Sequence, residues 1–345
     1  MKKVFLSIFV FILFYSCTSE DVKISENYIE KFEIADINPI EINIKNNQSL
    51  IYIWTNSDLY EELKKQVPHI KVSEGALLTK SEAYSSYTVT AENGMIREYT
   101  VEIDTTVPRM FSFEYWNLSE GNLTYYIPSN LKWASGNAGI GLALTILRID
   151  AKNPENYPTK KTEDGYKGNA VVMETLKGGD VFGRDVRLIS GNFFLGKFNA
   201  GKAIYDELEA TELGYIYPAK PKSIKGHYKY NEGPGAFIGF DNPLKQDSCN
   251  MNAWVYKSEN DTTLTVRNID STDLVIAKAV FNCSDTGGKF KEFEAIFNYT
   301  SEPDFENFNY KLGITFAASK DGAYYAGKIG SRLIIDEIEI TDYEE

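Results

Sequence analysis

Residues 84–103, YSSYTVTAENGMIREYTVEI, decide how the first part of the chain folds. Apolar and polar residues alternate on both sides of Glu92-Asn93-Gly94, as they do in strands that are buried on one face only. Asn-Gly between two such runs is the strongest short signal for a β-hairpin. A similar alternation in IEINIKN, residues 40–46, extends the pattern toward the N-terminus. Residues 31–104 are therefore predicted to form a small β-sandwich.

The remainder of the chain, from residue 110 to residue 345, also consists of short apolar runs separated by Gly, Asn, Asp and Pro clusters. No long run with a period of 3.6 residues is present, so no long helix is expected. About nine strands over this length favour an all-β double sheet, most simply a β-jelly roll. The segment DTTVPR, residues 104–109, follows a complete strand and is typical of a linker between two domains.

The N-terminus indicates export. Residues 1–16 contain two lysines and then a short apolar run, which is typical of a signal peptide and too short to span a bilayer. Ser16-Cys17 resembles a bacterial lipobox, so Cys17 is expected to carry acyl chains such as palmitate and to anchor the protein in the outer membrane. Residues 17–30 are predicted to be a tether. The alternative is a plain signal peptide with an incidental cysteine.

The tract Thr18 to Asp21 resembles the surface-export signal of Bacteroidetes lipoproteins, which implies that the lipid-anchored protein faces the cell exterior. An ordinary polar tether on the periplasmic side is the alternative. Removal of residues 1–16 would change the formal charge from −13 to −15, because Lys2 and Lys3 are lost. Such an acidic chain is not expected to bind nucleic acid, whose phosphates require a basic face. Outside the cytoplasm Cys249 and Cys283 could form a disulfide, although two buried thiols are an equally good interpretation.

Several stretches carry a resemblance to a known family. The phrase YTVTAENG…YTVEI resembles immunoglobulin-like modules near the N-terminus of Bacteroidetes surface lipoproteins. The later part resembles the putative carbohydrate metabolism domain (PCMD) family in five stretches: FSFEYWN (111–117), WASGNAG (133–139), LISGNFFLGKF (188–198), YPAKPKSIKGHYKY (217–230) and GSRLIIDEIEI (330–340). The resemblance implies an immunoglobulin-like β-sandwich over residues 31–104. It also implies a carbohydrate-binding-module-like β-jelly roll over residues 110–345 and a role connected with sugars.

A sugar site needs an aromatic ring that stacks on the apolar face of a pyranose, with planar polar groups beside it. Trp133 and Asn137 lie in a Gly- and Ser-containing segment, which favours a ligand-binding loop over core filling. Trp116 and Tyr126 are further candidates. The glycines at 136, 139 and 141 indicate tight turns or the close approach of a ligand. A glycan is the expected partner, together with other surface proteins of glycan utilisation.

A structural calcium ion is a further expectation, because jelly-roll sugar-binding modules often carry one that is held by oxygen ligands. Glu114 and Asp336 stand where such ligands occur in similar modules. Ordinary strand-edge acids are the alternative interpretation.

No catalytic residue can be assigned from the sequence. Glycoside hydrolases need two carboxyl groups about 5 to 9.5 Å apart. Two clusters could supply them, namely Glu174 with Asp180 and Asp185, and Glu292 with Glu294, but neither carries a catalytic signature. Three hypotheses follow: a surface glycan-binding lipoprotein, a glycoside hydrolase, and a structural or adhesive surface protein without a sugar site. The first is favoured.

Overall fold

The computed structural model describes residues 24–343 except 36, 38, 40, 83, 120, 131, 182, 240–244, 260 and 261. The expected signal peptide, Cys17 and the first residues of the expected tether lie outside the described residues. Within the described residues no helix is long and apolar enough to cross a membrane. The chain divides into two compact units, Met1–Thr105 and Thr106–Glu345, which are described separately.

The first unit is built from two sheets. A two-stranded sheet pairs β1 with β4, and a five-stranded sheet has the order β2-β3-β7-β6-β5, in which β3 and β7 are parallel. Its elements are β1 (Ile29–Glu33), β2 (Glu41–Lys45), β3 (Leu50–Thr55), η1 (Ser57–Leu59), α1 (Tyr60–Leu63), β4 (His69–Val72), β5 (Leu77–Glu82), β6 (Ser86–Thr90) and β7 (Ile96–Thr105).

The predicted hairpin forms the centre of this unit. Strands β6 and β7 are antiparallel neighbours, with Tyr87 opposite Tyr99 and Thr90 opposite Ile96. Gly94 in the turn has φ +90°, a left-handed backbone that favours glycine. The inward side chains Tyr87, Val89 and Tyr99 are fully buried and pack with residues of β1 and β3. The unit is thus a small β-sandwich, and its assignment to the immunoglobulin-like class stays a prediction.

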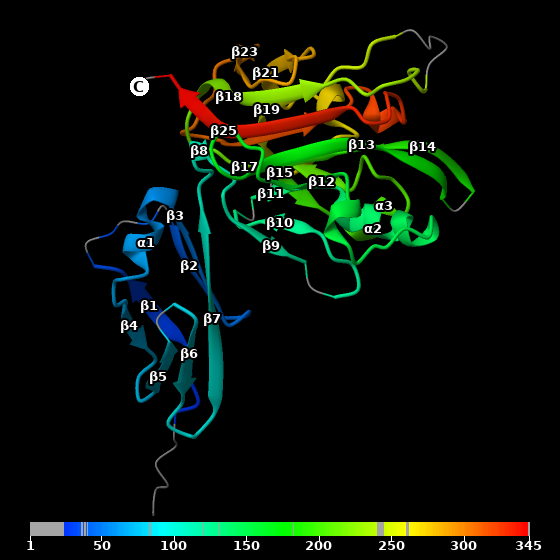
Figure 1. Ribbon diagram of the computed structural model, residues 1–345. Helices are drawn as coiled ribbons and strands as arrows, with labels where there is room; N and C mark the ends of the chain where they lie inside the picture. Colours follow the sequence, from blue (N-terminus) through cyan, green and yellow to red (C-terminus); the bar gives the residue numbers. More distant parts are fainter. Residues whose placement is uncertain are drawn as a thin grey trace, which may run out of the picture. The chain divides into compact units, whose positions relative to one another are not determined.

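The second unit contains a nine-stranded and a seven-stranded sheet, both antiparallel (Figure 1). The nine-stranded sheet comprises β11 (Trp133–Ala134), β15 (Asn192–Phe198), β16 (Thr211–Leu213), β17 (Tyr215–Ile216), β19 (Asn250–Ser258), β20 (Leu264–Thr265), β21 (Val275–Asn282), β23 (Asn298–Tyr299) and β24 (Asn309–Ala317). The seven-stranded sheet comprises β8 (Met110–Phe111), β12 (Thr159–Thr162), β13 (Ala170–Val181), β14 (Arg184–Ser190), β18 (Pro221–Asn231), β22 (Lys291–Ile296) and β25 (Arg332–Asp342).

The chain passes repeatedly from one of these sheets to the other. After β13 and β14 in the seven-stranded sheet it enters the nine-stranded sheet, and it returns for β18, β22 and β25. This alternation produces the double sheet of a jelly roll. The prediction of an all-β fold is confirmed, with short helical pieces between strands: α2 (Asn137–Ile146), η2 (Pro154–Asn156), α3 (Ala200–Ala203), η4 (Ile269–Ser271) and η5 (Gly322–Tyr324).

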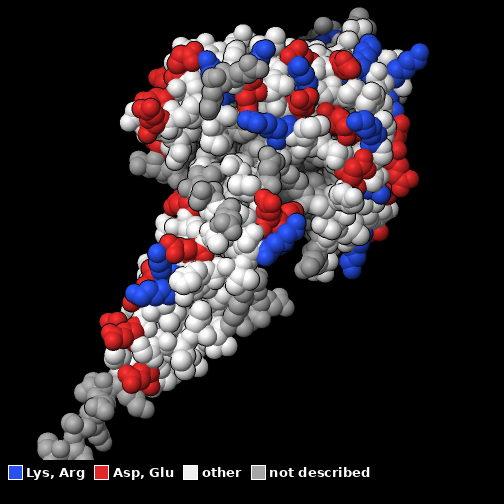
Figure 2. Space-filling view, turned by 90° about the vertical axis from the view of Figure 1, so that its left-hand side faces the viewer, with Lys and Arg blue, Asp and Glu red and all other residues white. Residues whose placement is uncertain are grey.

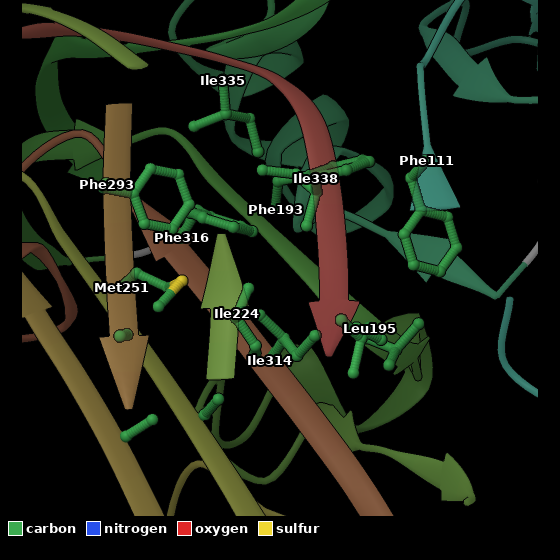
Figure 3. Close-up of a cluster of buried hydrophobic side chains, with 14 of the residues drawn as sticks. Phe111, Phe193, Leu195, Ile224, Met251, Phe293, Ile314, Phe316, Ile335 and Ile338 are labelled. Atoms are coloured by element: carbon green, nitrogen blue, oxygen red, sulfur yellow. The ribbon is translucent and has the colours of Figure 1, made fainter. Parts of the chain in front are cut away.

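The main core lies between the two sheets. Figure 3 shows its side chains converging from strands of both sheets, among them Phe193, Phe316 and Met251 from one and Phe293 and Ile335 from the other. Burial of these apolar faces is the dominant favourable contribution to folding, at about 25 cal/mol for each Å² removed from water.

Trp133 is one of the largest residues in this core and is only 2% exposed. Its indole stacks on Phe193 with ring centroids 4.9 Å apart and an interplanar angle of 4°. The rings of Phe111 and Phe113 meet it edge-on at 5.1 and 5.5 Å. Such aromatic pairs contribute beyond the area that they bury. Trp133 therefore joins the segment around β8 to the nine-stranded sheet.

Helix α2 corrects the prediction that the glycines at 136, 139 and 141 mark turns or a ligand site. Gly139 and Gly141 lie inside the helix, where a Cβ at Gly139 would come within 3.0 Å of the Phe198 ring. At Gly141 it would come within 2.9 Å of the Tyr157 hydroxyl. The glycines are required because the helix packs directly against these side chains.

Cys249 and Cys283 form a disulfide, which decides between the two interpretations of the sequence. Their Cα atoms are 5.3 Å apart, and the bridge joins the residues beside neighbouring strands β19 and β21. Both residues are buried in the main core. The cross-link agrees with a protein that folds in an oxidising compartment.

Replacement of Trp133 tests the role of the aromatic stack. Trp133→Ala should lower the free energy of unfolding by about 3 to 5 kcal/mol, because it removes a buried indole and leaves a cavity. Tyr115→Ala, which changes an exposed ring, should alter it by less than about 0.5 kcal/mol. Urea unfolding followed by circular dichroism measures both. Equal stability of Trp133→Ala and the wild type would contradict the core role.

Candidate functional site

A hairpin at the edge of the second unit forms one wall of the candidate site. Strands β9 (Trp116–Leu118) and β10 (Tyr126–Pro128) are antiparallel, with Trp116 opposite Pro128 and Leu118 opposite Tyr126. β10 lies close to β12, so the hairpin stands at the edge of the seven-stranded sheet. A hollow of about 380 Å³ opens here. It is lined by Glu114, Tyr115, Trp116, Asn117, Leu118, Tyr126, Ser129, Lys161 and Asn169.

Three aromatic side chains border this hollow. The half-buried indole of Trp116 packs against Phe193 and donates its Nε1–H to the carbonyl oxygen of Phe113 at 2.6 Å. The ring of Tyr126 meets it edge-on at 6.4 Å. Tyr115 is 79% exposed. The hollow therefore offers two rings that are fixed by packing and one ring that is free to contact a ligand.

Polar groups lie among these rings. The Asn117 amide donates to the Ser129 hydroxyl at 3.4 Å, and the Tyr126 hydroxyl donates to Glu155 Oε1 at 3.1 Å. Burial and the neighbouring Glu155 raise the pKa of Tyr126, so its hydroxyl stays protonated as a donor. The Lys161 ammonium lies 3.6 Å from Glu163 Oε1. Apolar faces beside amide, hydroxyl and ammonium groups match the mixed surface of a sugar.

The backbone at Phe113 determines which side chains reach the hollow. Phe113 has φ +54°, a left-handed conformation that costs a non-glycine residue about 1 to 2 kcal/mol. Burial of its ring against Trp133 and Phe193 offsets this cost. The turn brings Trp116 toward the core and leaves Tyr115 outside.

A loop of residues 165–169 forms another wall, and two carboxylates hold it. Glu114 Oε2 accepts the Asn169 N–H at 2.9 Å, while Asp336 Oδ2 accepts the Lys167 N–H at 2.8 Å. Gly168 has φ +55°, and a side chain there would collide with the Glu114 carboxylate. The loop is thus fixed by hydrogen bonds from its own backbone to Glu114 and Asp336.

These contacts bear on the predicted calcium site. The ion takes six to eight oxygen ligands, whereas backbone N–H groups point their positive ends at both carboxylates. Asp336 Oδ1 also accepts the Glu337 N–H at 2.8 Å. Among the described residues no group of three or more His, Cys, Asp or Glu could hold a metal ion. Glu114 and Asp336 thus anchor the loop, and their role as calcium ligands stays a prediction.

The other sequence predictions divide into two groups. Trp116 and Tyr126 do lie together at the hollow, as a sugar site would require. Trp133 is a core residue and cannot stack on a ligand at the surface. Asn137 is also fully buried, with its amide donating to the Thr159 carbonyl oxygen at 2.6 Å. The predictions for Trp133 and Asn137 are therefore wrong, because their segment packs inward and does not form an open loop.

Sequence reasoning missed Tyr115, Lys161 and Asn169. Tyr115 stands in the same FSFEYWN stretch as Trp116 and could have been included on that ground. Lys161 and Asn169 are distant in sequence and give no signal of their own.

The carboxylates considered for catalysis are engaged elsewhere. Glu174 lies between Lys160 Nζ at 3.2 Å and Arg332 Nε at 3.1 Å. Asp180 and Asp185 face each other near the tip of the β13–β14 hairpin. The Ser223 hydroxyl, at 2.8 Å, and nearby lysines lower the pKa of Glu294, which is opposite to what a proton donor needs. Neither cluster contributes to the lining of the hollow.

The charges on the second unit are mixed. On the face that Figure 2 shows, acidic and basic side chains are interspersed. Ion pairs of this unit include Lys229 with Asp164 at 2.5 Å and Lys167 with Glu337 at 2.7 Å.

Comparisons with known proteins indicate a carbohydrate-related family. The model of the family described as putative carbohydrate metabolism domain matches residues 107–341. A crystal structure described as a putative glycoside hydrolase from Bacteroides thetaiotaomicron is similar at a TM-score of 0.63 and 26% identity, covering 94% of this chain and 99% of that one. Another with the same description, from Bacteroides vulgatus, has a TM-score of 0.59 and 30% identity, covering 69% and 99%. No curated protein matches.

The anchoring carboxylate Asp336 predicts a pH dependence of stability. Burial raises its pKa, although the N–H donors of Lys167 and Glu337 oppose the shift. A raised folded-state pKa contributes stability that is present below the unfolded value of 3.8 and is lost as the pH rises through the folded value. The stability of the wild type relative to Asp336→Asn should therefore fall as the pH rises from about 3 to 6.

Asp285→Asn is the matched control for this measurement. Hydrogen bonds from the backbone N–H groups of Gly287 and Glu232 lower the pKa of Asp285. Its stabilising effect is present above pH 3.8 and is lost as the pH falls through the lowered pKa. The stability of the wild type relative to Asp285→Asn should therefore rise with pH, opposite to the trend for Asp336→Asn. Urea unfolding over this pH range measures both variants. The raised pKa of Asp336 would be contradicted if the free energy of unfolding of the wild type, relative to that of Asp336→Asn, stayed constant or rose with pH.

Proposed function

The chain belongs to the putative carbohydrate metabolism domain family, and we propose that it is a cell-surface lipoprotein that binds a polysaccharide. The binding site is the hollow between the β9–β10 hairpin, Lys161 and the loop of residues 165–169. One observation carries the proposal: three aromatic rings surround this hollow together with amide, hydroxyl and ammonium groups. Its volume of about 380 Å³ lies in the ordinary range of small-molecule sites.

The geometry supports a division of roles within the site. Trp116 and Tyr126 are held in place by packing and hydrogen bonds, so their rings need little ordering when a ligand arrives. Tyr115 lies outside them and closes over one face of a pyranose ring. The amides of Asn117 and Asn169 and the ammonium of Lys161 pair with sugar hydroxyls. A neutral glycan suits this lining better than a polyanion.

Glycoside hydrolysis is the second candidate function, because both Bacteroides relatives are described as putative glycoside hydrolases. Hydrolysis by the common mechanisms needs two carboxyl groups that flank the bond. Among the described residues, the lining of the hollow includes one carboxylate, Glu114, and it holds the Asn169 N–H. Release of reducing ends by the wild type, but not by Glu114→Gln, would favour hydrolysis over binding.

Anchoring at Cys17 places this site outside the cell. The proposal is supported by the apolar run of residues 4–15, by Ser16-Cys17 and by the acidic tract that follows. Several acyl chains hold a protein firmly, since each buried methylene contributes about 0.8 kcal/mol. Other surface proteins of glycan utilisation are the expected partners there.

A glycan screen tests the binding site. The chain from residue 18 onward should bind at least one plant, host or microbial polysaccharide, and Tyr115→Ala should weaken that binding about tenfold, or ~1.4 kcal/mol, because a stacking face is lost. Isothermal titration calorimetry gives the affinities. Tyr205→Ala removes a ring that is 81% exposed outside the hollow and should bind like the wild type. If no glycan on an array of plant, host and microbial polysaccharides is bound, a structural or adhesive protein is favoured.

Labelling with an alkyne analogue of palmitate tests the anchor in the bacterium. The wild type should carry the label and should be removed from intact cells by an added protease. Cys17→Ala should lose the label, because the acylated sulfur is absent. A label that persists in Cys17→Ala, or its absence from the wild type, would contradict lipid anchoring. A wild type that is labelled but protected from protease would contradict display on the outer face.

A further inference from the structure

A second hollow of about 830 Å³ lies on the same unit, around the end of β25. It is formed by the segment that precedes β18, the last residues of β25 and the loop that precedes β24. Six of its lining residues carry the chemistry considered below: Arg109, Lys220, Glu302, Phe305, Asp342 and Tyr343. None of the residues that line it also lines the candidate sugar site.

Two aromatic rings are accessible in this second hollow. Phe305 is 40% exposed and rests edge-on against the buried Tyr310, with centroids 5.2 Å apart. Tyr343 is 42% exposed, and the Lys220 ammonium lies 4.7 Å from its centroid. Each ring thus contacts a neighbouring side chain, and part of its surface remains open to solvent.

Four of the five charged side chains that line the hollow form ion pairs within it, and the fifth is Glu339. Arg109 Nη2 lies 2.7 Å from Asp342 Oδ2, and Lys220 Nζ lies 2.5 Å from Glu302 Oε2. The Tyr217 hydroxyl donates to Asp342 Oδ1 at 2.8 Å, which fixes the carboxylate from the protein interior. A neutral ligand that presents apolar faces and hydroxyl groups suits such paired charges better than an ion does. The second hollow therefore has the same kind of lining as the first.

A short segment of the chain connects the two hollows. Arg109 lines the second and Glu114 lines the first, and five residues span at most about 18 Å. Between them Phe111 and Phe113 are buried in the core, whereas Ser112 and Met110, which is 64% exposed, face solvent. Exposed residues thus alternate with buried ones along the segment between the two hollows. Several sugar units fit within this distance.

Building on the proposed function, we propose that the second hollow is a further glycan subsite and that one extended, neutral oligosaccharide occupies both hollows. Occupation of the first subsite places the rest of the same glycan at a high effective concentration near the second. Affinity then depends on the length of the glycan, and a disaccharide is too short to use both subsites. The preferred ligand is a polysaccharide or a long oligosaccharide.

A length series tests this proposal. The probes are cello-, manno-, xylo- and chito-oligosaccharides from the disaccharide to the octasaccharide, titrated by calorimetry into the chain from residue 18 onward, which retains both units. For a series that binds, affinity should rise at least about tenfold with length and then level off. Phe305→Ala should lower the affinity for the octasaccharide at least about fivefold and leave the shortest ligand that binds unchanged.

Two further variants separate the possible outcomes. Tyr115→Ala should weaken the binding of short and long ligands alike, whereas Tyr205→Ala should weaken the binding of neither. Thermal melts check that all variants are folded. Binding that requires Tyr115 but is equal for long and short ligands, or unaffected by Phe305→Ala, would overturn the second subsite and leave the proposed function standing. Failure of the wild type to bind any of these probes would overturn this proposal, while polysaccharide binding in the array would still support the function.

Discussion

The burial of two sheet faces against each other is the constraint on which the second unit depends. The stack of Trp133 on Phe193, with Phe111 and Phe113 edge-on, ties the segment around β8 to the nine-stranded sheet. This packing uses most of the large rings near the N-terminal end of the unit. Trp116, at the margin of the same cluster, is held on one side by the core and opens on the other side to the hollow. The candidate site is therefore an extension of the core to the surface.

The loop of residues 165–169 is held by hydrogen bonds to two carboxylates. Glu114 and Asp336 accept backbone N–H groups from this loop. Asp336 is buried for this purpose, and its raised pKa reflects the cost of the charge. Glu114 both accepts a hydrogen bond from the loop and lines the hollow. The stability of the loop and the shape of the site are thus linked through a single side chain.

The fold could be predicted further than the site. Alternation around Asn93-Gly94 gave the hairpin, and the short apolar runs gave an all-β second unit, because both signals are local. Helix α2 was missed since glycine disfavours helices, and only the close approach of Phe198 and Tyr157 explains Gly139 and Gly141. Simple alternation after Phe111 and Phe113 would have placed Tyr115 inside. The left-handed backbone at Phe113 interrupts the alternation of buried and exposed residues. No sequence rule predicts such a conformation in a phenylalanine. Trp133 was misassigned because its glycine-rich neighbours resemble a loop.

A crystal structure of the chain with a bound glycan from the screen tests the central claim most directly. The account predicts a sugar ring in the hollow beside the β9–β10 hairpin, in contact with Trp116, Tyr126 or Tyr115 and within hydrogen-bonding distance of Asn117, Asn169 or Lys161. A glycan bound on another surface, with this hollow free of sugar, would contradict it.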